Sequence, residues 1–163
     1  MRRIVSAMLI GAVLGAAPAT GESLGTETQR PLPRFVSMKA GEANVRRGPS
    51  LTHRVDWVFR HRGLPLMVTA EYGHWRRVRD RDGIGGWMHY AMLSGARTAV
   101  VVADMTELLR QADADAPVVA RAERDAVVRI TRCNPEWCRV SAGSHRGWVP
   151  SADLWGATAP ERD

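Results

Sequence analysis

Short apolar segments separated by turn residues run along most of this chain. Within the first half of the chain these segments are 55–59, 64–68, 74–79 and 86–88, and several of them alternate apolar and polar side chains, as half-buried β-strands do. Turn residues recur every 8–12 positions, and the charged run 79–83 predicts the tip of a hairpin. Short strands at even spacing predict an all-β fold, either a small barrel or a sandwich.

One group of residues occurs twice. Trp75–Val78 and Gly86–Leu93 return as Trp137–Val140 and Gly147–Leu154. The two tryptophans of a copy are 12 positions apart in the first copy and 11 in the second. Two similar units of about 60 residues predict two small domains or one pseudo-symmetric pair.

Residues 104–112 contain two conflicting patterns. Asp104 and Glu107 have the spacing of a helix capping box, and apolar residues follow at helical intervals. The repeat instead requires an extended segment, because the matching part of the first unit is not helical. We favour extended or irregular structure here, followed by a loop over residues 113–117.

Three motifs in order resemble the bacterial SH3-like (SH3b) domain family. Residues 43–50 (Ala-Asn-Val-Arg-Arg-Gly-Pro-Ser) resemble its opening motif, and Trp75–Val78 and Gly86–Met88 resemble its W-x-x-V and G-W-V strands. The resemblance covers residues 34–95 and, without the opening motif, 97–156. It implies two tandem, partly open β-barrels. It also implies a binding module of an exported bacterial protein, and many such modules engage cell-wall peptides or glycans.

A groove for proline-rich ligands, as in eukaryotic SH3 domains, is not favoured. In those domains a proline and a tyrosine line the groove. The second unit keeps Pro150 but has Asp153 in place of the tyrosine, and the first unit has His89 and Met92 at these two positions.

The first 19 residues resemble a secretory signal peptide. A positive start at Met1–Arg3 precedes the apolar run Ile4–Ala16 and a small-x-small site at 17–19. The run is short for a membrane span, so we expect cleavage and no stable membrane insertion, with an uncleaved anchor as the alternative. We then expect an extended linker over 20–33 and a frayed tail over 157–163.

Cys133 and Cys138 are the chain's two cysteines, with an Asn-Pro turn between them. On a hairpin they would face each other within disulfide distance, and an exported protein meets an oxidising compartment. A redox or metal pair is less favoured, because the spacing is not C-x-x-C and there is no second thiol pair. We therefore predict an intramolecular disulfide in a periplasmic or secreted protein.

The net charge of +6 does not indicate a nucleic-acid partner. Two arginines leave with the signal peptide, so the mature chain is near +4 (6 − 2). The remaining arginines are spread along the chain rather than grouped in blocks, and an exported protein seldom meets nucleic acid.

Candidate ligand-binding residues all lie in the first unit. Trp57 is the best candidate for an exposed stacking surface, because the second unit has no equivalent. The four recurring tryptophans are instead expected in the cores. Arg77 and Arg79 share one face of a strand, where their guanidinium groups suit carboxylates. The full candidate set is Trp57, Arg46, Arg77, Arg79 and Tyr90.

No motif in the chain indicates catalysis. The five histidines lack zinc-site spacings, and no serine stands in a G-x-S-x-G context. We expect no metal and no cofactor. The sequence predicts a non-catalytic binding module for a cell-envelope polymer, either a peptidoglycan stem peptide or a glycan. The alternative is a scaffold that recruits a periplasmic enzyme, and a hydrolase of unrecognised type is a remote third.

Overall fold

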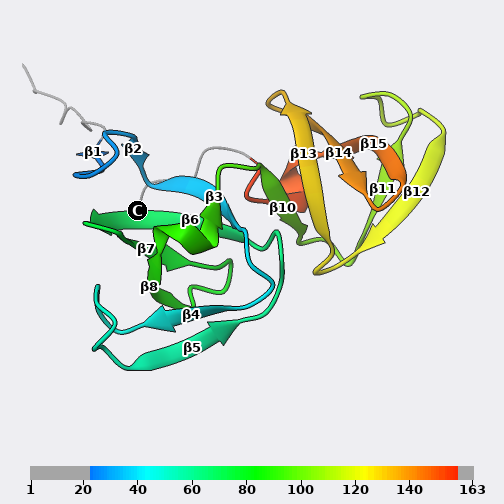
Figure 1. Ribbon diagram of the computed structural model, residues 1–163. Helices are drawn as coiled ribbons and strands as arrows, with labels where there is room; N and C mark the ends of the chain where they lie inside the picture. Colours follow the sequence, from blue (N-terminus) through cyan, green and yellow to red (C-terminus); the bar gives the residue numbers. More distant parts are fainter. Residues whose placement is uncertain (1–22, 158–163) are drawn as a thin grey trace, which may run out of the picture.

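A computed structural model describes residues 23–157 of the 163-residue chain. They form two seven-stranded antiparallel sheets, each around its own core (Figure 1: cyan and green, then yellow and orange). The predicted all-β fold of two tandem small barrels is therefore confirmed. The predicted signal peptide and residues 158–163 of the predicted tail lie outside the described residues. Within 23–157 no helix has the length and hydropathy to cross a membrane.

The first barrel has the strand order β5-β4-β8-β7-β6-β3-β9, and a short 3-10 turn, η1 (Tyr90–Met92), joins its last two strands. Its inward side chains are mostly Val, Leu and Met, as strand alternation requires. The strands are β3 (Arg34–Met38), β4 (Ala43–Arg46), β5 (Val55–Phe59), β6 (Pro65–Tyr72), β7 (Trp75–Arg79), β8 (Gly85–His89) and β9 (Leu93–Ser94).

The second barrel repeats this topology strand for strand, in the order β12-β11-β15-β14-β13-β10-β16. Residues 104–112 contain β11, so the expectation of extended structure is confirmed; pairing with β12 and β15 buries Leu108 completely. Its elements are β10 (Thr98–Val101), β11 (Met105–Leu109), β12 (Val118–Glu123), β13 (Val127–Cys133), β14 (Trp137–Ala142), β15 (His145–Pro150), η2 (Ser151–Asp153) and β16 (Leu154–Trp155).

Glycine before the second tryptophan of each copy allows two strands to cross closely. A Cβ on Gly86 would lie 2.6 Å from the carbonyl oxygen of Arg46, and a Cβ on Gly147 would lie 2.7 Å from the Cβ of Leu108. Both contacts are closer than real Cβ atoms tolerate. The repeated Gly-Trp pair therefore marks where β8 approaches β4 and where β15 approaches β11.

Residues before the first barrel are folded onto it, so the prediction of an extended linker over 20–33 is wrong for most of its length. Strands β1 (Ser23–Leu24) and β2 (Pro31–Leu32) form a small hairpin, and Leu32 is buried in the first core. The hairpin is held by the carboxylate of Glu71 on β6. Glu71 accepts hydrogen bonds from the backbone of Glu27 (3.0 Å) and from the backbone and hydroxyl of Thr28 (2.8 Å each).

Glu71 is a fully buried carboxylate surrounded by donors. The guanidinium of Arg34 donates to it at 2.6 Å, and that of Arg76 lies 3.4 Å away. Burial alone would raise the pKa of Glu71, but the hydrogen bonds from Arg34, Thr28 and Glu27 outweigh it and lower this pKa to about 2. Glu71 is therefore charged at neutral pH and ties the N-terminal hairpin to the barrel.

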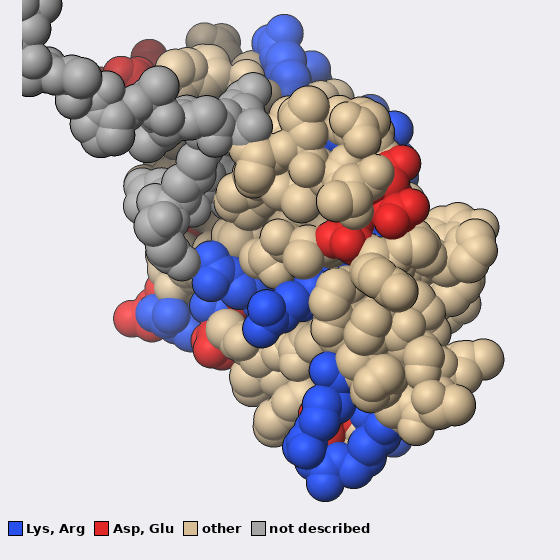
Figure 2. All heavy atoms as spheres, turned by 90° about the vertical axis from the view of Figure 1, so that its left-hand side faces the viewer, with Lys and Arg blue, Asp and Glu red and all other residues tan. Residues whose placement is uncertain are grey.

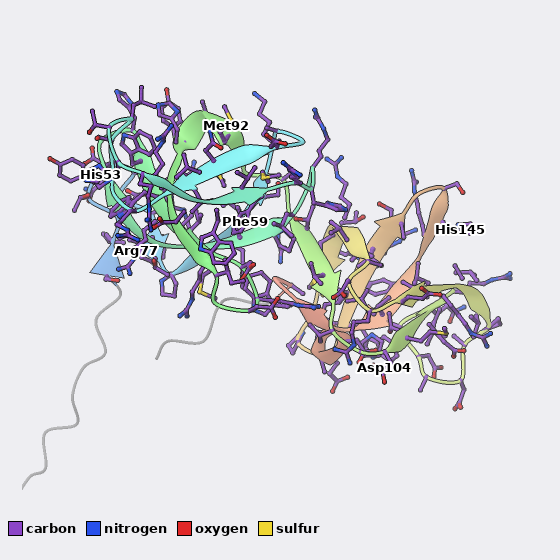
Figure 3. The ribbon with its side chains drawn as sticks, turned by 90° about the horizontal axis from the view of Figure 1, so that it is seen from below. His53, Phe59, Arg77, Met92, Asp104 and His145 are labelled. Carbon is purple, nitrogen blue, oxygen red and sulfur yellow. A yellow bond between two sulfur atoms is a disulfide. The ribbon has the colours of Figure 1, made fainter. Side chains whose placement is uncertain are left out.

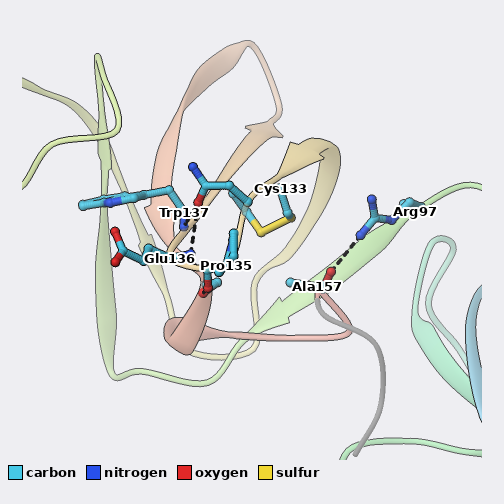
Figure 4. Close-up of a disulfide and its surroundings, with 9 residues drawn as sticks. Arg97, Cys133, Pro135, Glu136, Trp137 and Ala157 are labelled. Carbon is cyan, nitrogen blue, oxygen red and sulfur yellow. Dashed lines mark hydrogen bonds between the residues drawn. A yellow bond between two sulfur atoms is a disulfide. The ribbon is translucent and has the colours of Figure 1, made fainter.

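The predicted disulfide between Cys133 and Cys138 is present, closing the β13–β14 hairpin (Figure 4). Its two cysteines are a cross-strand pair, next to a register shift in β13. The corresponding pair in the first barrel, next to the same shift in β6, is Glu71 and Arg76. A covalent bridge in one barrel thus occupies the place of a buried ion pair in the other.

The two barrels contact each other through a small set of residues. The rings of Phe35 and Trp155 meet edge to face, with centroids 4.8 Å apart. The guanidinium of Arg81, on the β7–β8 loop, forms an ion pair with Asp125. The contact with Phe35 gives a structural role to Trp155, one of the two tryptophans outside the repeat.

Candidate functional site

A pocket of about 150 Å³ lies on the outward face of the first barrel. Its walls come from β4, β7, the end of β8, the turn η1 and the loop after β4. Most of the exposed lining is apolar, and an amide, a guanidinium and an imidazole also contribute to it. The lining residues are Asn44, Arg46, Leu51, Trp75, His89 and Met92.

The opening motif of the first unit builds one wall of this pocket. Arg46 donates from Nη1 to the carbonyl oxygens of Leu51 (3.1 Å) and His53 (2.7 Å), which holds the loop in place. His53 in turn lies within 3.0 Å of the Ser50 hydroxyl, and a side chain at Gly48 would collide with its ring. The predicted ligand residue Arg46 therefore also shapes the pocket.

Four rings form a cluster at another wall. The ring of His89 lies 5.5 Å from that of Trp75 and 4.9 Å from that of Tyr90, and His74 completes the group at 5.5 Å from Tyr90. The Arg76 guanidinium lies 5.9 Å from the centre of the Tyr90 ring. Tyr90, which is 48% exposed, thus borders the pocket without lining it. This ring cluster offers flat surfaces to a ligand.

The recurring tryptophans are not core residues, so that expectation is wrong. Trp75, Trp87, Trp137 and Trp148 are all half-buried, whereas Val78 and Val140 on the same strands are buried. Residues three apart on a strand point to opposite faces, so a W-x-x-V motif that buries its valine turns its tryptophan outward. This signal was present in the sequence and predicts the outward position of Trp75.

Arginines stand beside these tryptophans on the outward face. Arg77 is the cross-strand partner of Trp87, and Arg46 pairs with Trp87 from the other side. Arg77 and Arg79 share this face while Arg76 is buried on the other, as the alternation predicts. Arg79 stands at the far end of β7, where its Nε lies 3.4 Å from the sulfur of Met67. Arg77 lies in the first barrel, as does the pocket residue Met92 (Figure 3).

Trp57 lies apart from this pocket. It is 49% exposed, which agrees with the expected exposure, and it stands on the edge strand β5 opposite Val45. Because Val45 is a core residue, Trp57 extends the inward face of the sheet beyond the core. Its counterpart in the second barrel is Ala120, opposite Leu108. The structure thus places Arg46, Arg77 and Tyr90 at or near the pocket and places Trp57 elsewhere.

Other arginines of the first barrel are neutralised locally. Asp56 accepts hydrogen bonds from Arg47 (3.1 Å) and Arg54 (2.8 Å), and the bond from Arg47 is the main cause of a lowered pKa of Asp56. Viewed from the side of the first barrel, the basic side chains form separate groups with neutral surface between them (Figure 2). Among residues 23–157 no three His, Cys, Asp or Glu side chains lie close enough to hold a metal ion.

The shared topology, the repeated W-x-x-V and Gly-Trp motifs and the outward pocket define a protein of two tandem SH3-like modules. A family model described as "Bacterial SH3 domain" matches residues 39–95 and 102–156. The chain belongs to this family, whose members are binding domains. No curated protein matches the chain.

Two solved structures show distant similarity. They are NlpC2 and NlpC1 from Trichomonas vaginalis, each 12% identical to this chain with a TM-score of 0.35. The matches cover 76% and 80% of this chain and 48% of each of those chains. This chain therefore spans about half the length of either structure, and we base no functional conclusion on them.

Proposed function

We propose that this protein is a non-catalytic binding module that engages a cell-envelope ligand through the first-barrel pocket. The observation that supports this proposal is the pocket itself, whose lining is mostly apolar and includes Trp75, His89 and Arg46, with Arg77 further along the same face. A peptide that bears small apolar side chains and free carboxylates would match both parts. The ligand class that we favour is therefore a peptidoglycan stem peptide, with the wall glycan as the second form of the same target.

We infer that the protein acts in the periplasm or outside the cell. The disulfide supports this location, since such bonds persist in oxidising compartments. The expected signal peptide over 1–19 supports it as well. Intact-mass measurement of periplasmic material tests the inference: a mature chain beginning near Thr20 is expected, and a chain that still starts at Met1 would contradict it.

Sedimentation with purified peptidoglycan tests the binding proposal. The mature protein should pellet with the wall material. Leu51→Asp should remove this co-sedimentation, because Leu51 lines the pocket yet is 75% exposed, so the fold does not depend on it. Leu24→Asp is the matched control, at an apolar residue that is 52% exposed and outside the pocket. Loss of pelleting in both variants, or in neither, would contradict the assignment of the pocket.

A protein–protein scaffold is the second candidate, and the edge strand β5 favours it. Trp57 and Val58 are both exposed there, and an edge strand offers unpaired backbone groups to another chain. A scaffold would co-purify with a periplasmic protein, fail to pellet with wall material, and lose its partner in Trp57→Ala. If the natural protein pellets with wall material and Trp57→Ala pellets equally well, the scaffold role of β5 is excluded.

A further inference from the structure

The outward face of the second barrel concentrates unneutralised positive charge. Four arginines lie on it, from three adjacent strands, and all four are exposed. Within residues 23–157 none of the four makes an ion pair, whereas Arg121 and Arg124 of the same barrel pair with Glu107 and Asp104. The members of this arginine face are Arg129 and Arg132 on β13, Arg139 on β14 and Arg146 on β15.

The strand register brings like charges together on this face. Arg132 and Arg139 are direct cross-strand partners, and Ser141 pairs with both Arg129 and Arg146. Like charges directly opposite each other on a sheet destabilise the pairing. The free protein therefore loses stability at this position, and an anion bound between the guanidinium groups would restore it.

Trp148 organises the arginine face. It is the cross-strand partner of Arg139, and the guanidinium of Arg132 lies over its ring at 4.8 Å. A guanidinium stacked on an aromatic ring keeps the N–H groups along its edge available. Those donors form a fork that matches the two oxygens of a carboxylate.

The first barrel shows that this arrangement is not a requirement of the shared fold. The strand register aligns the positions of Arg129, Arg132 and Arg146 with those of Met67, Ala70 and Gly85 in the first barrel. The fourth arginine, Arg139, aligns with Arg77. Three of the four charges are thus specific to the second barrel. The face differs from the first-barrel pocket in position and in chemistry.

We propose that the arginine face of the second barrel binds an acidic polysaccharide through carboxylates on successive sugar units. Four guanidinium groups spread over three strands exceed what one terminal carboxylate can engage, so a ligand with carboxylates in series fits best. Trp148 lies among them and offers an apolar ring that suits the face of a sugar. This site does not depend on what the first-barrel pocket binds.

Nuclear magnetic resonance titration of the full mature protein tests this proposal. The probes are a galacturonic acid trimer, the neutral maltotriose and triglutamate, compared at equal ionic strength. The acidic trisaccharide should cause saturable shifts of the Arg132 and Arg139 side-chain N–H signals and of the Trp148 indole signal, and maltotriose should cause none. Equal binding of triglutamate would overturn the saccharide assignment, and no saturable shift with any probe would overturn the site.

Single substitutions separate binding from folding. Arg132→Gln and Arg139→Gln should each weaken the acidic trisaccharide about tenfold, the effect of one charge-assisted hydrogen bond. Arg139→Gln should keep or raise the melting temperature, because it relieves the like-charge pair, whereas Arg132→Gln also loses the contact of its guanidinium with the Trp148 ring. Arg121→Gln is the matched control, since Arg121 is exposed and paired with Glu107. Unchanged affinity in both variants, or an equal loss in the control, would refute the proposal.

Discussion

Replacing Glu71 by glutamine should release the N-terminal hairpin from the first barrel. The carboxylate accepts four hydrogen bonds, two from backbone N–H groups and two from side chains, and it also faces Arg76. Glutamine keeps the shape but loses the charge, and its NH₂ group would meet donors where the carboxylate has acceptors. Arg34 would then be left largely buried without its counter-ion.

The pKa of Glu71 sets the size of the expected effect. Its ordinary value of 4.5 falls to about 2 in the folded protein. That difference corresponds to about 3 kcal/mol of stability, which is similar to the cost of breaking a buried ion pair. Because the folded pKa is the lower one, this stability is fully present above pH 4.5 and is lost as the pH falls from there towards 2.

Two measurements test this role of the Glu71 carboxylate. Urea unfolding followed by circular dichroism should show the loss of about 3 kcal/mol in Glu71→Gln at pH 7, and a smaller loss of stability between pH 4.5 and 2 than in the natural protein. Hydrogen exchange should show residues 23–34 losing protection in the variant. The control is Glu42→Gln, which breaks an exposed ion pair with Arg60 and should change stability by less than about 1 kcal/mol.

The reasoning would be refuted by a Glu71→Gln protein that is as stable as the natural one at pH 7 with residues 23–34 still protected. Such a result would mean that the hairpin is held by Leu32 and its apolar contacts alone. If Glu71→Gln loses no more stability than Glu42→Gln, solvent screens the charge of the Glu71 carboxylate.

Three further predictions concern stability. Cys133→Ser should lower the free energy of unfolding of the second barrel, measured by urea unfolding, by about 2 kcal/mol, because the disulfide closes a short loop. A loss above about 4 kcal/mol would contradict an explanation by loop-closure entropy alone. Gly147→Ala should destabilise the second barrel by about 1–3 kcal/mol through its contact with β11, whereas Gly95→Ala, which meets open space, should leave the unfolding curve unchanged. Trp57→Ala should shift the melting temperature little, given its 49% exposure, and an unfolded variant would show that its ring completes the core.

The architecture could be predicted from the sequence because both copies retain the residues that build the barrel. Val78 and Val140 fill equivalent core positions, and Gly86 and Gly147 permit equivalent strand crossings. The repeat also resolved residues 104–112 correctly against a local helical pattern, because pairing of β11 on both edges outweighs helical propensity.

The site was only partly predictable, for reasons that lie in tertiary contacts. Arg46, Arg77 and Tyr90 come from the expected set, but the pocket also needs Leu51 and Met92, which have no local pattern to mark them. Trp75 could have been placed on the outward face from its spacing to Val78. The N-terminal hairpin could not have been foreseen, because its partner Glu71 lies more than 40 positions away and looks like a surface residue in the sequence.

Each of the two equivalent hairpins, β6–β7 and β13–β14, has a cross-strand link. The link is an ion pair in β6–β7 and a disulfide in β13–β14. The Cys133–Cys138 bond is complete in itself and is opened by reductant, with no dependence on proton concentration in this range. The Glu71–Arg76 pair is indifferent to reductant and is weakened by acid. It also leaves carboxylate lone pairs that require more donors, and the N-terminal hairpin supplies them. A reductant therefore opens the cross-strand link of the β13–β14 hairpin and leaves that of β6–β7 intact, whereas acid weakens the β6–β7 link and leaves the disulfide intact.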